Sequence, residues 1–272
     1  MKVTINNKKI EVDDNAILED VIKKYFKEKN IVAAHVNDAP RDLSDLVTNN
    51  SIIEPITTDD KDGLDILRHT CAHIFGHAIK QIYPEVKMVI GPVIENGFYY
   101  DILSKNPITE KDLQIIENRM RKLAKKNYSI KREVVSKDKA ISIFKDRKEP
   151  YKIELLKEIN EEEIIAVYHH EEYVDMCRGP HLTNTKHIKA FKLMKTSGSY
   201  WKGNSENQAL TRIYGTAWPD TDSQDAYLKS LDEAEKRDHR ILGKKLDLFH
   251  FQEESPGTVS YTHLRAHETL LY

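Results

Sequence analysis

At 272 residues the chain is long enough for two modest domains, each burying a core of its own. Apolar residues make up 39% and charged residues 32% of it, which excludes wholesale disorder, and a formal net charge of −2 gives no overall positive field for nucleic acid. The two cysteines suggest no disulfide framework, and no apolar run has the length of a membrane span or the pattern of a signal peptide. We therefore expect a cytoplasmic protein with no membrane contact.

Residues 1–60 predict a small unit of their own. Two short extended runs flank Asn6-Asn7-Lys8-Lys9, which is a hairpin signal, and a helix is expected over Ala16–Lys29 with Asp14 or Asn15 as its N-cap. Extended runs return at Ile31–Val36 and Ser51–Ile56. This order of elements predicts a β-grasp (ubiquitin-like) fold, with the polar linker Thr57–Gly63 after it.

Residues 61–220 predict an α+β domain. Its expected helices are Leu64–Tyr83, Glu110–Asn127 with Thr109 as its cap, and Lys137–Phe144. Ile90–Asp101 predicts two strands joined by a turn, and Tyr151–Tyr200 is read mostly as short strands and loops. Asp222–Phe249 predicts one long charged helix, which makes residues 221–257 a linker helix.

Three histidines on the first of these helices stand out. His69, His73 and His77 recur at i, i+4 spacing, so their side chains form a stripe with neighbouring Cβ atoms roughly 5–6 Å apart. Other positions of the same helix already supply an apolar face for packing. A single histidine is most often a packed or solvent-facing residue, but a stripe of them favours a site.

A second cluster, Cys177-Arg178-Gly179-Pro180-His181, follows a strand-like segment. Gly-Pro prevents a regular helix, so Cys177 and His181 are expected on a turn. Two helix imidazoles with this thiol and imidazole suit either four tetrahedral metal ligands or a polar pocket that orients a substrate and a water. Spacing alone leaves both chemistries open.

Longer motifs carry a resemblance to one family. The motifs, in chain order, are His69-Thr70-Cys71-Ala72-His73, Ile90-Gly91-Pro92, Asn96–Asp101 (NGFYYD), Tyr173–His181 (YVDMCRGPH), Phe191–Thr196 (FKLMKT), Tyr200-Trp201, Leu210–Trp218 (LTRIYGTAW) and Ala234–Leu248 (AEKRDHRILGKKLDL). Their residues and their order resemble the editing region of bacterial-type threonyl-tRNA synthetases, with residues 1–60 similar to the TGS domain of that family and residues 61–220 to its editing domain.

The resemblance implies a hydrolytic site for seryl-tRNA made in error on threonine-specific tRNA, whose acceptor end would be the partner. Such a bond is an ester, so a positioned and activated water is sufficient, and neither a cofactor nor a covalent intermediate on Cys177 is required. His69 and Lys152 match the family's water-activating pair. The residues that match the pocket lining and the substrate contacts are His73, Tyr100, Asp175, Cys177 and His181. His77 lies outside this pattern and is read as packing or support.

The resemblance extends over about residues 1–257 and implies a further domain that would bind ATP, threonine and zinc. The segment 258–272 departs from the family pattern, and we expect it to be a non-native tail. We therefore expect the parent enzyme to be a threonine–tRNA ligase and a homodimer through the further domains, and this chain to be unable to attach threonine to tRNA.

Two other functions remain compatible with these residues. A zinc-dependent deacylase of the alanyl-tRNA type would use His69, His73, Cys177 and His181 as ligands. A non-catalytic RNA-binding or regulatory module would instead use residues 1–60 and the basic segment Lys236–Lys245. Metal analysis tests the first alternative, and the effect of His69→Ala on function tests the second.

Overall fold

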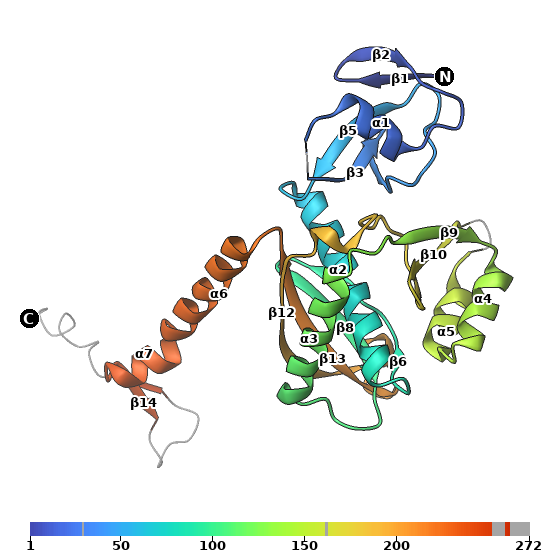
Figure 1. Cartoon of the computed structure of the whole chain (residues 1–272). Helices are drawn as coiled ribbons and strands as arrows, with labels where there is room; N and C mark the ends of the chain where they lie inside the picture. Colours follow the sequence, from blue (N-terminus) through green and yellow to red (C-terminus); the bar gives the residue numbers. More distant parts are fainter. Residues whose placement is uncertain (29, 161–162, 252–258, 262–272) are drawn as a thin grey trace, which may run out of the picture. The chain divides into compact units, whose positions relative to one another are not determined.

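The computed structural model of the chain describes residues 1–28, 30–160, 163–251 and 259–261 (Figure 1). The chain forms two compact units, Met1–Thr221 and Asp222–Tyr272. Both contain helices and strands, which agrees with the expected α+β class. Among the described residues no helix is both long and apolar enough to cross a membrane.

The first unit begins with a five-stranded sheet in the order β2-β1-β5-β3-β4. Its strands are β1 (Lys2–Ile5), β2 (Lys8–Glu11), β3 (Ile31–Val36), β4 (Ala39–Arg41) and β5 (Ile52–Thr57). β1 is parallel to β5 and antiparallel to β2, and the predicted β1–β2 hairpin is confirmed, with Asn6 and Asn7 at positive φ. The apolar face of helix α1 (Leu18–Tyr25) packs with this sheet in a common core.

The helix of this sheet is shorter than the predicted Ala16–Lys29, and neither Asp14 nor Asn15 caps it. Asn15 has a φ of 68°, so it forms part of a turn and cannot take the extended conformation of an N-cap. At the other end Phe26 is extended and packs against the core, which ends the helix early. The spacing of the apolar residues predicted where the helix lies, whereas the backbone conformations of the flanking residues determine where it begins and ends.

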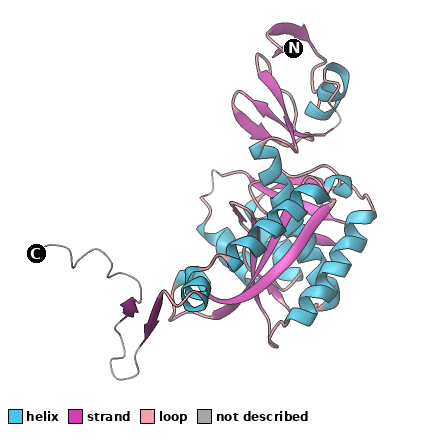
Figure 2. Ribbon diagram, turned by 90° about the vertical axis from the view of Figure 1, so that its left-hand side faces the viewer, coloured by secondary structure: helices cyan, strands magenta, loops and turns pink. Residues whose placement is uncertain are grey.

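The main core of the first unit lies under a second sheet, in which β12, β13, β8 and β6 are neighbours in that order and β7 pairs with β8. The strands are β6 (Lys87–Met88), β7 (Val93–Ile94), β8 (Gly97–Leu103), β12 (Ala190–Tyr200) and β13 (Ala209–Trp218). Helices α2 (Lys61–Ile82) and α3 (Glu110–Lys125) lie along this sheet (Figures 1 and 2). The predicted cap of α3 is confirmed, because Thr109 and Asp112 form a reciprocal capping box.

A third sheet completes the first unit. It is antiparallel with the order β11-β10-β9, and its strands are β9 (Lys131–Val135), β10 (Ile165–His170) and β11 (Tyr173–Met176). Helices α4 (Lys137–Asp146) and α5 (Pro150–Glu158) contribute Phe144 and Leu156 to a small core with Val167. Two short 3₁₀ turns, η1 (Thr185–His187) and η2 (Trp201–Gly203), flank β12.

Helix α5 corrects the reading of Tyr151–Tyr200 as mostly strands and loops. Pro150 occupies the first turn of α5, where its missing N–H costs no hydrogen bond and its fixed φ suits a helix. The correction matters because α5 carries Lys152, which is only 4% exposed. A lysine expected on an irregular segment therefore sits on a buried helical face.

The second unit corrects another prediction. The single helix expected over Asp222–Phe249 is two helices, α6 (Thr221–Lys236) and α7 (His239–Lys245). Asp238 breaks it, because its backbone is not helical, with a ψ of 123°, and its side chain accepts from the N–H of Arg240 as the N-cap of α7. Strand β14 (Phe249–Phe251) pairs with β15 (Val259–Tyr261), and apart from β15 the proposed tail 258–272 lies outside the described residues.

Candidate functional site

Helix α2 carries the predicted histidine stripe. His69 and His73 lie about one helical turn apart, and their ring centroids are 5.2 Å apart, edge to face. His69 is partly exposed, whereas His73 is 3% and His77 0% exposed. The stripe therefore leads from a partly exposed side chain to two buried ones.

The turn after β11 meets this stripe. Residues 177–182 form neither helix nor strand, as the Gly-Pro pair predicts, and Gly179 has a φ of 69°. The His181 ring lies with its centroid 4.4 Å from that of His69 and 4.1 Å from that of His73. The Cys177 Sγ atom is 3.0 Å from His181 Nε2. Two segments far apart in the sequence thus form one cluster.

Hydrogen bonds from the helix fix the tautomer of His181. The Thr70 hydroxyl donates to the Ile66 carbonyl at 2.8 Å and accepts from the Leu182 N–H at 3.1 Å. It therefore offers a lone pair to His181 Nδ1, 3.0 Å away, and Nδ1 carries the hydrogen. His181 Nε2 is left as an acceptor that faces Cys177.

A buried ion pair lies beside the cluster. Lys152 Nζ is 2.5 Å from Asp175 Oδ1, which also accepts the Met176 N–H, while Asp175 Oδ2 accepts the hydroxyls of Tyr100 at 2.6 Å and Tyr173 at 2.8 Å. A carboxylate has about four acceptor positions, so those of Asp175 are all occupied. Asp175 was expected to contact the substrate, and a direct contact with an ammonium or hydroxyl of a seryl group would require one of these donors to give way.

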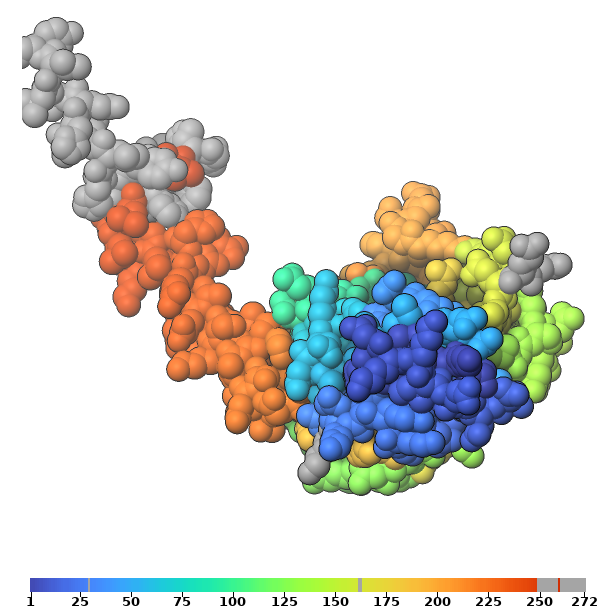
Figure 3. Space-filling model, turned by 90° about the horizontal axis from the view of Figure 1, so that it is seen from above, coloured from blue at the N-terminus to red at the C-terminus, as the bar shows by residue number. Residues whose placement is uncertain are grey.

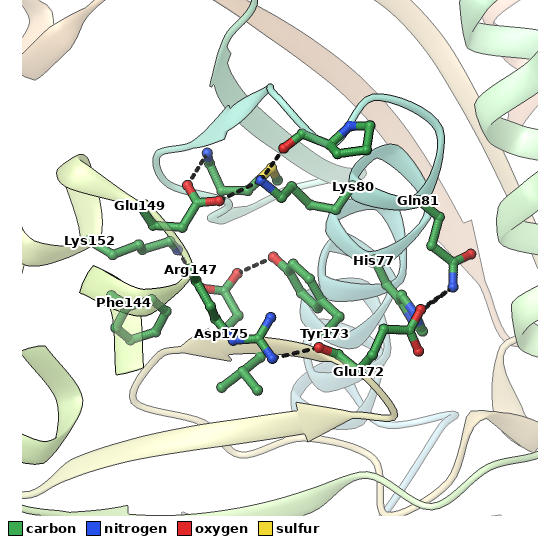
Figure 4. Close-up of a pocket in the computed structure, with 13 residues that line it drawn as sticks. His77, Lys80, Gln81, Phe144, Arg147, Glu149, Lys152, Glu172, Tyr173 and Asp175 are labelled. Atoms are coloured by element: carbon green, nitrogen blue, oxygen red, sulfur yellow. Dashed lines mark hydrogen bonds and ion pairs between the residues drawn. The ribbon is translucent and has the colours of Figure 1, made fainter. Parts of the chain in front are cut away.

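Two cavities meet at this ion pair. The first, of about 430 Å³, is lined by His69, His73, Tyr100, Lys152, Asp175 and Cys177 among others, and His181 lies against its imidazoles. It therefore brings together the residues that the sequence singled out, which we call the histidine pocket. The second cavity, of about 270 Å³, lies beyond Lys152 and Asp175 and is also lined by His77, Glu149 and Glu172 (Figure 4).

The imidazoles of the histidine pocket are neutral at neutral pH. Burial, aided by Lys152, lowers the pKa of His69 to about 4 despite the opposing charge of Asp175. Burial and then the neighbouring imidazoles hold the pKa of His73 and that of His181 well below their ordinary value. Each ring therefore has one nitrogen that can accept a proton or bind a metal.

The acidic groups of the pocket differ in charge. Burial alone would raise the pKa of Asp175, but Lys152 and the hydrogen bonds of the network hold it below its ordinary value, so this side chain is ionised. Burial and then the charge of Asp175 raise the pKa of the Cys177 thiol well above its usual range. The thiol stays protonated, which argues against Cys177 as a nucleophile.

The sequence did not single out several supporting residues. Tyr173 donates to Asp175, and this pair was detectable because alternate residues of a strand share a face. His170 Nε2 lies 3.2 Å from His73 Nδ1, a contact across 97 residues that no local pattern signals. Asp42 accepts the His181 N–H at 3.0 Å, so residues 1–60, blue in Figure 3, support the turn of the pocket.

The absence of a side chain at Gly76 lets Tyr173 pack against helix α2. A Cβ atom at Gly76 would lie 2.3 Å from the Tyr173 hydroxyl, which donates to Asp175. We expect Gly76→Ala to lower the free energy of unfolding by about 1–3 kcal/mol, because overpacking outweighs the ~1 kcal/mol that alanine gains in a helix. Urea unfolding measures the change. Gly198→Ala is the control, since nothing lies within 4 Å of its Cβ position, and an equal loss there would contradict the steric cause.

Comparison with known proteins shows what the chain that forms this pocket is similar to. Residues 165–214, which include β10, β11 and the Cys177–His181 turn, match the family described as "Threonyl and Alanyl tRNA synthetase second additional domain". The chain is 54% identical over 231 residues to the threonine–tRNA ligase of Acinetobacter baumannii (strain SDF), which covers 85% of this chain and 36% of that protein. Over most of its length the chain is thus similar in sequence to part of the threonine–tRNA ligases.

A second relative agrees with the first. The threonine–tRNA ligase of Prochlorococcus marinus (strain MIT 9211) is 54% identical over 228 residues, 84% of this chain and 36% of that protein. The chain thus spans about a third of the length of the relatives that it matches. The resemblance to threonyl-tRNA synthetases that the sequence motifs suggested is confirmed.

Proposed function

We propose that the histidine pocket hydrolyses seryl-tRNA made in error on threonine-specific tRNA. The observation that carries the proposal is the meeting of His69, Lys152 and the Cys177–His181 turn at one cavity of about 430 Å³. The family match over residues 165–214 supports aminoacyl-tRNA as the substrate class. A second site is useful because serine lacks one methyl group of threonine, which is worth only about 1–3 kcal/mol of discrimination.

In this mechanism His69 is the general base. Its ring is neutral, lines the pocket and remains partly exposed, so a water can reach it. His69 takes a proton from the attacking water, which adds to the ester carbonyl and forms a tetrahedral oxyanion. Collapse of this intermediate releases serine, and the ribose oxygen leaves as a hydroxyl once it has received a proton.

Lys152 stabilises the oxyanion in this proposal. An ammonium group that is held in place acts without reorganisation when the negative charge develops. Asp175 and Tyr100 hold that group, since Lys152 Nζ contacts the carboxylate at 2.5 Å and the Tyr100 hydroxyl at 3.1 Å. We therefore assign Asp175 and Tyr100 primarily to positioning Lys152, while His73, Cys177 and His181 line the place of the seryl group.

The proposal is tested by release of serine from seryl-tRNA by the purified chain. We expect seryl-tRNA for threonine to be hydrolysed and threonyl-tRNA to be spared under the same conditions. Equal hydrolysis of both would contradict an editing role. No hydrolysis of either, despite demonstrated binding of the tRNA, would contradict the hydrolytic assignment itself.

The rate of hydrolysis should stay constant down to an unusually low pH. Burial is the main cause that lowers the pKa of His69 to about 4. The imidazole is therefore neutral and able to accept a proton above pH 4, and it loses this ability as the pH falls through that value. We expect kcat/KM for seryl-tRNA to decline only near pH 4. A decline centred near the ordinary imidazole value of about 6.5 would contradict His69 as the base.

We also propose a domain division at the polar linker. Residues 1–60 would be a β-grasp domain of the TGS type, supported by the parallel β1–β5 pair and the helix packed on the sheet, and residues 61–220 the editing domain. Separately expressed residues 1–60 should then unfold cooperatively in urea. A linear, non-cooperative response would argue against an independent domain.

A zinc-dependent deacylase is the second candidate, and one observation favours it. One donor atom from each of His69, His73, Cys177 and His181 lies within 4.8 Å of the other three. A tetrahedral zinc shell needs donors about 3.3–3.8 Å apart, so a small inward movement would fit the ion. A catalytic zinc needs an open position, so three of these four residues would hold the ion and the fourth would give its place to a water, which zinc would ionise to the attacking hydroxide.

Metal analysis separates the two candidates. Zinc in equal amount with the chain, lost in Cys177→Ala together with hydrolysis, would support the zinc-dependent route. Undiminished hydrolysis by chain that has been stripped of metal with a chelator would support direct action by His69 and Lys152.

A further inference from the structure

A line of hydrogen-bonded side chains leads from the histidine pocket to the surface. His73 Nδ1 lies 3.2 Å from His170 Nε2, and His170 Nδ1 lies 3.4 Å from the Tyr128 hydroxyl. The same hydroxyl lies 3.2 Å from His77 Nδ1, and His77 Nε2 lies 2.9 Å from Glu172 Oε1. The Glu172 side chain is 61% exposed, whereas His170 is fully buried. We call these five residues the histidine relay.

The outer end of the relay has only one hydrogen-bonding option. Burial opposes charge on Glu172, but hydrogen bonds from Gln81 and His77 hold its pKa at about 2, so it is a carboxylate and accepts hydrogen bonds only. His77 Nε2 therefore carries a hydrogen toward Glu172. Figure 4 shows His77, Gln81 and Glu172 together at one end of the second cavity.

Gln81 offers a competing donor to the same nitrogen. Its amide nitrogen lies 3.0 Å from His77 Nε2, and its amide oxygen is fixed on the other side because it accepts from Arg119 Nε. The carboxylate decides the outcome, since a bare His77 Nε2 would face the negatively charged Glu172 oxygen at 2.9 Å. The Gln81 amide has its own bond to Glu172 and does not need the imidazole as an acceptor.

The remaining donors follow in order from this end. With its hydrogen on Nε2, neutral His77 has a bare Nδ1, which accepts the Tyr128 hydroxyl hydrogen. The Tyr128 oxygen then accepts from His170 Nδ1–H, and the bare His170 Nε2 accepts from His73 Nδ1–H. His73 Nε2 is thereby left without a hydrogen.

We propose that Glu172, through the histidine relay, fixes His73 as the tautomer whose bare Nε2 lies toward Asp175 in the histidine pocket. His73 Nε2 and Asp175 Oδ2 are 4.0 Å apart, a separation that suits two acceptors with no hydrogen between them. The pocket thus receives an acceptor for a substrate hydroxyl or a water. This consequence for hydrolysis rests on the proposed function, whereas the tautomer itself rests on the hydrogen bonds alone.

Histidine ¹⁵N spectroscopy tests the tautomers without any substrate. In the full chain labelled with ¹⁵N-histidine, long-range ¹H–¹⁵N correlation spectra distinguish a protonated from a bare ring nitrogen. We expect hydrogen on Nδ1 of His73 and His170, and on Nε2 of His77. Hydrogen on Nε2 of His73 in the unmodified chain would overturn the proposal.

Two variants test the direction of the relay. Tyr128→Phe removes the central link, so His73 and His170 should each become a mixture of tautomers while His77 keeps its hydrogen on Nε2. Glu172→Gln can present its amide N–H to His77 and should therefore also mix the tautomers of His77. Unchanged His73 signals in both variants would overturn the relay.

Matched controls separate the relay from general damage. Tyr83→Phe removes a hydroxyl that donates to Asp112, and Glu171→Gln changes the neighbouring carboxylate, which pairs with Lys126. Both should leave the His73 spectrum unchanged. In hydrolysis, Tyr128→Phe should lower kcat in proportion to the tautomer that is lost, about twofold for an even mixture, with little change in KM. If the unmodified chain shows the expected tautomers but does not hydrolyse seryl-tRNA, the proposed function is contradicted and the relay is not.

Discussion

His69→Ala is expected to reduce the single-turnover rate of seryl-tRNA hydrolysis by about 10²–10⁴-fold, the contribution of a positioned general base. The side chain lines the pocket, its neutral ring is the most exposed imidazole of the cluster, and alanine leaves no group to accept the proton of water. Affinity for the tRNA should change little, because a general base acts on the attacking water rather than on the tRNA. Release of labelled serine and a binding titration measure the two quantities.

The control for this variant is His169→Ala. His169 lies on β10 but is directed to Glu133, 2.9 Å away, and is not among the residues of the histidine pocket. The His169→Ala chain should hydrolyse seryl-tRNA at the rate of the unmodified chain. A His69→Ala chain that keeps full activity would show that another group activates the water, and a non-catalytic RNA-binding module would predict that result.

Lys152→Met is expected to affect both stability and hydrolysis. The side chains of Lys152 and Asp175 are 5% and 1% exposed, so removing one partner leaves a buried, uncompensated charge. Such losses cost about 3–5 kcal/mol, and we expect the lower end because Tyr100, Tyr173 and the Met176 N–H still donate to Asp175. Hydrolysis should fall by about 10²-fold or more through loss of oxyanion stabilisation.

Lys202→Met is the matched control for the stability change. Lys202 also pairs with carboxylates, Glu154 and Glu158, but its side chain is 40% exposed, and such surface pairs are worth about 0–1 kcal/mol. The double variant Lys152→Met/Asp175→Asn should recover part of the stability, because it no longer buries the unpaired carboxylate of Asp175. It should not recover activity, because the ammonium group of Lys152 is still missing. If Lys152→Met unfolds at the same urea concentration as Lys202→Met, the buried pair does not have the energetic weight assigned to it.

The sequence predicted the residues that line the site better than the residues that hold them in place. Four-residue spacing was enough to put His69 and His73 on one side of a helix, and the Gly-Pro pair was enough to put Cys177 and His181 on a turn. Spacing alone left open whether these four groups bind a metal or form a polar pocket, and the family resemblance made their convergence on one site a specific prediction. His170, Tyr128 and Asp42 reach the site through tertiary contacts that have no period in the sequence.

Errors in the predicted elements arose where local conformation overrode an average pattern. The apolar period of Asp222–Phe249 continues through Asp238, but the short side chain of Asp238 satisfies a backbone N–H and ends one helix before the next. Helix α5 was missed because it is only nine residues long and mixes charged with apolar positions. Its stability comes from packing, as Leu156 lies in the small core with Phe144.

The central claim is that the ester-bearing end of a seryl-tRNA binds in the histidine pocket beside Lys152. The most direct measurement is a crystal structure of the chain with a seryl-adenosine analogue that carries an amide in place of the ester. We predict the seryl carbonyl within hydrogen-bonding distance of Lys152 Nζ and a water between that carbonyl carbon and His69. An analogue bound outside the pocket, with these two side chains free of it, would contradict the account.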